Sequence, residues 1–177
     1  SANPGSGEAS YLRYRIVAEC ENVRRRGSEL DSLAASLQGA EQRRRREALA
    51  HLRGRCDGMS AVPYSDALAA SLLADAVERG DRKAIVHQLA QDILLTARDT
   101  FGPSISEDQL SRLRSGVQSK DPVAMVMAGQ TLSNAFRDLV IEETNSGREI
   151  DYRTAREAWR MLGCDFGLEC GVEHQAV

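Results

Sequence analysis

The sequence predicts an all-α protein of roughly seven helices in antiparallel hairpins, arranged as a bundle or a short α-solenoid. Apolar residues recur at helical spacing, helix start and stop signals punctuate them, and no segment alternates with period two. With 177 residues the chain can bury a core of its own. We therefore expect a single helical domain over residues 11–177, behind a small, polar and flexible tail at residues 1–10.

The first helix is expected to end near Gly27, where its apolar pattern stops. Residues 28–31 resemble a capping box and predict the start of a second helix. Gly39 weakens or breaks that helix, and the pattern resumes as far as Leu52. The apolar positions of the first helix are Tyr11, Leu12, Ile16, Val17, Cys20 and Val23.

Later helices begin at residues whose side chains accept hydrogen bonds from helix N-termini. Ser106 with Gln109 is a further capping box, and Asp121 stands before a proline, which favours the first helical position. The expected N-caps are Ser65, Asp81, Ser106, Asp121 and Asp151. The expected core includes Leu89, Leu132, Phe136 and Trp159.

An internal repeat is suggested by residues 81–86 and 121–126, each of which follows a shorter helix with a serine cap. Gly80-Asp81 and Asp121-Pro122 each hold part of a Gly-Asp-Pro-x-Ala pattern. Over residues 65–143 the chain thus resembles the Sel1-like and tetratricopeptide families. This resemblance implies stacked helical hairpins.

The four cysteines, Cys20, Cys56, Cys164 and Cys170, allow three disulfide connectivities. A short glycine-containing loop can bring Cys164 and Cys170 together, which leaves Cys20 with Cys56. Two alternatives stay open. One is four free thiols in a cytosolic protein, and the other is a zinc site from Cys164, Cys170 and His174, although its spacing is wider than zinc motifs use.

The segment Ala158–Cys164, continuing to Cys170-Gly171, resembles the C-terminal segment of uncharacterised exported helical proteins of bacteria. The resemblance implies an oxidising compartment and a disulfide there. We therefore expect a periplasmic or secreted protein, with the cytoplasm as the alternative. A polar tail such as residues 1–10 could follow a removed signal or a lipid-anchored cysteine.

A run of four arginines, Arg43, Arg44, Arg45 and Arg46, is the candidate partner-binding feature. Successive positions lie about 100° apart on a helix, so the four side chains fan out and at least one lies over the core face. Residues 1–60 hold eleven arginines and eight acidic residues and so carry a net charge of +3. Because the whole chain has a net charge of −3, residues 61–177 carry −6. A basic end suits an acidic partner or a membrane surface, whereas a solvated helix with nearby acids is the simpler interpretation.

No catalytic motif is present: the chain lacks phosphate loops, nucleophile elbows and His-Glu-x-x-His. Carboxylate pairs such as Glu142 with Glu143, or Glu19 with Glu21, leave acid–base catalysis as an alternative. We expect a non-enzymatic exported protein without a cofactor or metal that binds another protein as an inhibitor or immunity protein, an adaptor or an envelope-assembly factor. A cytosolic regulator is a further alternative. Nucleic-acid binding is not expected, and peripheral or lipid-anchored membrane association is compatible with the sequence.

Overall fold

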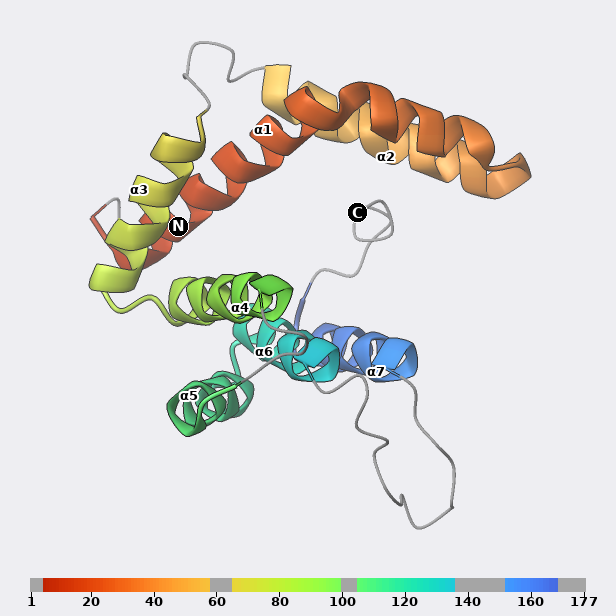
Figure 1. Cartoon of the computed structure of the whole chain (residues 1–177). Helices are drawn as coiled ribbons and strands as arrows, with labels where there is room; N and C mark the ends of the chain where they lie inside the picture. Colours follow the sequence, from red (N-terminus) through yellow and green to blue (C-terminus); the bar gives the residue numbers. More distant parts are fainter. Residues whose placement is uncertain (1–4, 58–64, 100–104, 136–151, 169–177) are drawn as a thin grey trace, which may run out of the picture. The chain divides into compact units, whose positions relative to one another are not determined.

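A computed structural model describes residues 5–57, 65–99, 105–135 and 152–168. These residues form seven helices and contain no strand (Figure 1), which confirms the all-α prediction. The helices are α1 (Gly7–Ser36), α2 (Gly39–Asp57), α3 (Asp66–Glu78), α4 (Arg82–Asp99), α5 (Glu107–Gln118), α6 (Pro122–Ala135) and α7 (Tyr152–Asp165).

The contacts within the chain separate two compact units, which meet in sequence between Arg79 and Gly80. Unit 1 holds α1, α2 and α3, and unit 2 holds α4 to α7. The expected single domain over residues 11–177 stays a prediction.

Helix α1 begins earlier and ends later than the sequence indicated. Ser6 caps it, because its hydroxyl accepts a hydrogen bond from the Ala9 N–H at 3.2 Å, so helix replaces the expected tail from Gly7 on. The predicted end near Gly27 is wrong, as is the new helix start at residues 28–31. A single interior glycine costs only about 1 kcal/mol, and good helix formers on both sides of Gly27 outweigh it.

The helix breaks just before Gly39, one of the two outcomes that the sequence allowed there, and α2 then runs back along α1. Gly39 has φ +60°, a left-handed conformation that glycine adopts without steric cost. Figure 1 shows α2 beside the C-terminal half of α1 and α3 beside its N-terminal half. One long helix therefore supports two neighbours at different points along its length.

Buried side chains of α1 and α3 form one part of the core of unit 1. The rings of Tyr11 and Tyr14 lie 5.9 Å apart, and both residues are buried. At one end the Ser10 hydroxyl donates to Asp75, and Arg79 donates to the same carboxylate at 2.8 Å. These hydrogen bonds hold the pKa of Asp75 below its ordinary value, that from Ser10 having the largest effect. Other buried apolar side chains here are Val17, Leu73 and Ala76.

Unit 2 is built around α6, which contacts α4, α5 and α7. The approach of α7 is close because Gly129 lies directly under the indole of Trp159, where a Cβ would clash with the ring. Gly163 of α7 likewise leaves room for the side chain of Val126. Small residues at such positions bring helix axes together and fix which faces meet.

The predicted core residues of unit 2 are found at or beside its core. Leu89 is buried, Leu132 is half-buried against the core cluster, and Trp159 is half-buried over Gly129. Phe136 lies outside the described residues. The main buried side chains are Val86, Leu89, Ile93, Leu113, Ala124 and Ala128.

Four of the predicted N-caps are confirmed. The Ser65 and Ser106 side chains accept hydrogen bonds from the third residue of their helices, and Gln109 completes the capping box at Ser106. Asp81 and Asp121 each accept, at 2.9 Å, from the backbone N–H three residues later. This local likeness agrees with the suggested repeat, although the resemblance to hairpin-repeat families stays a prediction. Asp151 lies outside the described residues.

Candidate interaction surface

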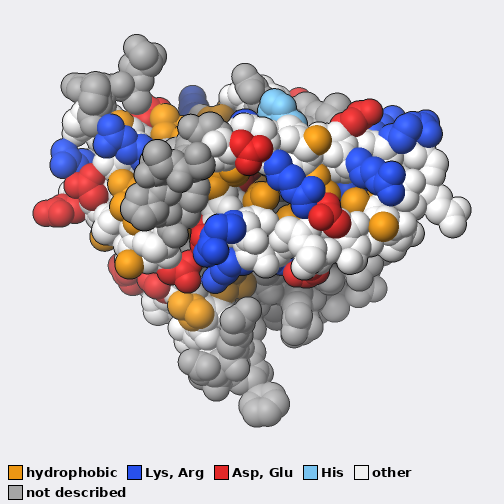
Figure 2. All heavy atoms as spheres, turned by 90° about the horizontal axis from the view of Figure 1, so that it is seen from above, with side chains coloured by type: hydrophobic (Ala, Val, Ile, Leu, Met, Phe, Trp, Pro, Cys, Tyr) orange, Lys and Arg blue, Asp and Glu red, His pale blue; other side chains and the backbone are white. Residues whose placement is uncertain are grey.

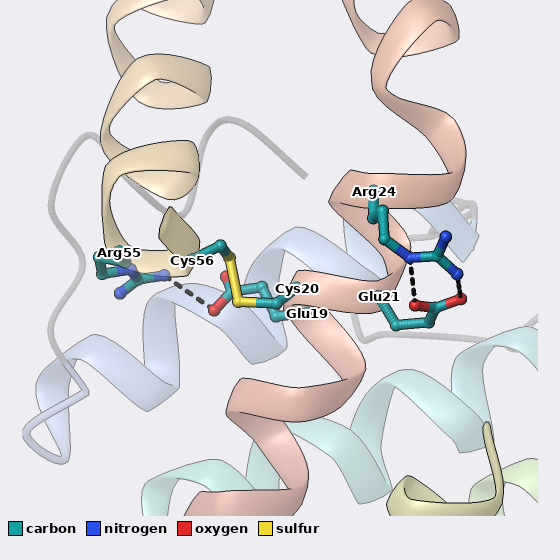
Figure 3. Close-up of a disulfide and its surroundings, with 6 residues drawn as sticks. All are labelled: Glu19, Cys20, Glu21, Arg24, Arg55 and Cys56. Atoms are coloured by element: carbon teal, nitrogen blue, oxygen red, sulfur yellow. Dashed lines mark hydrogen bonds and ion pairs between the residues drawn. A yellow bond between two sulfur atoms is a disulfide. The ribbon is translucent and has the colours of Figure 1, made fainter. Parts of the chain in front are cut away.

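A disulfide joins Cys20 in the middle of α1 to Cys56 at the end of α2 (Figure 3). Their Cα atoms are 5.5 Å apart, a usual separation for a disulfide. This pairing is one of the two expected from the sequence. Beside it Arg55 donates to Glu19 at 2.8 Å, so a covalent bond and an ion pair fix the same turn of α2 to α1.

Cys164 is also disulfide-bonded, and the described residues include no free cysteine. Its expected partner, Cys170, lies outside the described residues, as does His174. A bonded Cys164 cannot supply the thiolate that the zinc alternative needs. Within the described ranges no three His, Cys, Asp or Glu residues gather where they could hold a metal ion.

The contact between α1 and α2 buries few apolar side chains and includes several polar bonds. Three side chains of α2 are buried, those of Ala48, Leu49 and Leu52. Arg53 reaches across to α1, where it donates to the Gly27 carbonyl at 3.2 Å and to Asp31 at 2.9 Å. The disulfide and these polar contacts therefore supplement a small apolar contact between the two helices.

The arginine run fans around α2 as its spacing predicts. Arg45 is half-buried on the side of Leu49 and Leu52, four and seven residues further on. Arg43, Arg44 and Arg46 are exposed, and none of the three makes an ion pair with a described residue. Their charges are thus available for a partner.

The carboxylates of Glu19 and Glu21 do not form a catalytic pair. Glu19 binds Arg55 beside the disulfide, whereas Glu21 lies on another side of α1 and accepts two hydrogen bonds from Arg24, at 2.6 and 2.8 Å (Figure 3). The hydrogen bonds from Arg24 are the main reason that the pKa of Glu21 is lowered. A carboxylate held ionised in this way is a poor general acid. The other proposed pair, at residues 142 and 143, lies outside the described residues.

Charge and apolar surface are mixed on this protein. Figure 2 shows, on one face, groups of Lys and Arg side chains separated by hydrophobic and acidic ones. Sequence periodicity placed Leu12 and Ile16 among the apolar positions of the first helix, but both side chains are exposed. Helix α2 ends at Asp57 and leaves these two residues uncovered, which local spacing does not reveal.

None of the described helices combines the length and the apolar character required to cross a bilayer. No family model, no curated protein and no solved structure matches the chain.

Proposed function

We propose that this chain is an exported, non-enzymatic protein that binds an acidic surface of a partner protein through its α1–α2 hairpin. The observation that carries the proposal is the set of exposed arginines Arg43, Arg44 and Arg46, which have no ion pair among the described residues. They lie on an arm that a disulfide holds in place.

The chemistry of these side chains favours a carboxylate-rich partner. Guanidinium groups bind carboxylates in forked pairs, as Arg24 and Arg26 do within this chain. Arginine is also weakly hydrated, so it enters an interface at lower cost than lysine. The net charge of +3 on residues 1–60 would steer an acidic partner toward this end of the sequence.

Export is supported by the cysteines. A disulfide between helices persists in oxidising compartments and is rare in the reducing cytosol. The Cys20–Cys56 bond closes a 36-residue separation, and Cys164 is bonded as well. Both fit a protein that is stabilised by cross-links outside the cytoplasm.

Affinity capture from an envelope extract tests the proposal. The wild-type chain should retain one dominant partner, and binding should weaken as salt is raised, since exposed charges are screened. The triple variant R43E/R44E/R46E should lose that partner. A matched control, R82E/R114E/R156E, makes the same change in net charge on exposed arginines of unit 2 and should keep it.

Two outcomes would contradict the proposal. One is repeated capture in which no partner is recovered. The other is equal loss of the partner in the control variant, which would mean that total charge and not the α2 surface determines binding.

A further inference from the structure

Helix α1 has two apolar sides, and each side contacts a different helix. One side packs against α3 and includes Tyr14 and Val17. The other side faces α2, because Glu19, Cys20, Gly27 and Asp31 all make bonds to α2 from it. We call this second side the α2 side of α1.

The α2 side continues beyond the end of α2. Ile16 and Val23 are seven residues apart, and Leu12 stands four before Ile16, so all three share this side of the helix. Val23 is buried where α2 runs alongside. Helix α2 ends at Asp57, one residue after the disulfide to Cys20, so it does not extend along the turns that carry Leu12 and Ile16.

The result is an exposed continuation of an interface that the protein itself uses. Leu12 is 48% exposed and Ile16 is 41% exposed. Arg13 and Arg15 are exposed too, and neither makes an ion pair with a described residue. At about 100° per residue they lie on opposite flanks of the Leu12–Ile16 stripe.

We propose that the Leu12–Ile16 stripe is a second docking site, which takes an amphipathic helix with an apolar face and acidic flanks. A helix is the fitting occupant because α2, itself a helix, covers the same side one turn further on. Acidic flanks fit because Arg13 and Arg15 border the stripe on both sides. The occupant would continue the path of α2 along α1.

This proposal refines the proposed function, since it names a partner segment, but it uses a different surface. Arg43 lies thirteen residues before Cys56, which is about 20 Å along α2 at 1.5 Å per residue. The stripe lies on the other side of the disulfide, toward the start of α1. Substitutions on one surface can therefore test one proposal without affecting the other.

The test uses a stapled helical peptide with leucines on one face and glutamates on both flanks, titrated into the ¹⁵N-labelled full chain. Amide shifts should be confined to the first turns of α1 around Leu12 and Ile16. The variant L12S/I16S should weaken binding by roughly tenfold or more, because two apolar contacts are lost. The control L33S changes an apolar residue of α1 that is 43% exposed and should leave binding unchanged.

A charge swap tests the flanks. The variant R13E/R15E should lose the glutamate peptide and gain a peptide with lysines in the same positions. All substituted side chains are exposed, and circular dichroism should show unchanged helix content in each variant. Unchanged helix content would show that a loss of binding does not come from unfolding of the variant.

Several results would overturn the inference. They are no binding of the glutamate peptide, shifts located elsewhere, equal binding of the lysine peptide to wild type, or dimerisation of the chain that L12S/I16S abolishes. Preference of the stripe for anionic lipid vesicles over the peptide would also overturn it. If L12S/I16S still captures the envelope partner while R43E/R44E/R46E does not, the docking site fails and the proposed function stands.

Discussion

Removal of the Cys20–Cys56 disulfide should destabilise unit 1 about as much as the truncation of one buried leucine of α2. The two cysteines are 36 positions apart in the sequence, so the cross-link restricts the unfolded chain by about 4 kcal/mol of free energy, which its removal forfeits. The two buried leucines of α2, Leu49 and Leu52, contribute about 1.5–3 kcal/mol each. The cross-link is therefore comparable to the apolar contact that it accompanies.

The assay is urea denaturation of the variant C20A/C56A without reductant, followed by circular dichroism. Alanine is chosen because Cys20 is only 4% exposed, and a serine hydroxyl there would need a hydrogen-bond partner. The free energy of unfolding of unit 1 should fall by about 2–4 kcal/mol. Amide exchange should rise through Gly39–Asp57, with little change in α6 of unit 2.

A control separates the cross-link from the packing of the sulfur atoms. Wild type and C20A/C56A, both measured in excess dithiothreitol, should have nearly the same stability, since neither then holds the bond. If the oxidised wild type exceeds the variant by less than about 1 kcal/mol, the hairpin does not depend on its cross-link and the reasoning is wrong.

Two further predictions follow from close packing and from ionisation. Gly129→Ala should destabilise unit 2 by about 1–3 kcal/mol in thermal unfolding, because the added methyl group meets the ring of Trp159. Gly54→Ala, with open space around it, should instead stabilise α2 by about 0.5–1 kcal/mol. The opposite ranking would show that helix propensity decides the stability at both sites. The lowered pKa of Glu21 adds stability above the pKa of an unfolded glutamate, about 4.3, and this is lost as the pH falls through the lower folded value. Urea unfolding of E21Q should therefore lose less stability than wild type between pH 5 and pH 3, and equal slopes would mean that the bond to Arg24 has no such effect.

Local signals were enough for much of the fold. The caps at Ser65, Asp81, Ser106 and Asp121 were found because a cap involves one side chain and the next few backbone amides. The predicted helix end at Gly27 is wrong because the local sequence around a glycine does not distinguish a position inside a helix from one at its end. The approach of Arg53, which donates to the Gly27 carbonyl, is a tertiary contact that no local pattern contains.

The candidate surface was predictable in part. The fan of Arg43–Arg46, with one side chain over the core, follows from helix geometry alone. The exposure of Leu12 and Ile16 does not, because their spacing is the same as that of buried residues. It depends on where α2 ends relative to α1, and hence on the register that the Cys20–Cys56 bond fixes.

The Cys20–Cys56 bond also determines what proteolytic cleavage does to unit 1. An enzyme that cuts after arginine would meet four consecutive sites at Arg43–Arg46, three of them with exposed side chains. A cut there separates the peptide chain between Cys20 and Cys56, yet the fragments remain covalently joined through sulfur. The nicked molecule would keep α1 and α2 side by side and would migrate as two pieces only after reduction.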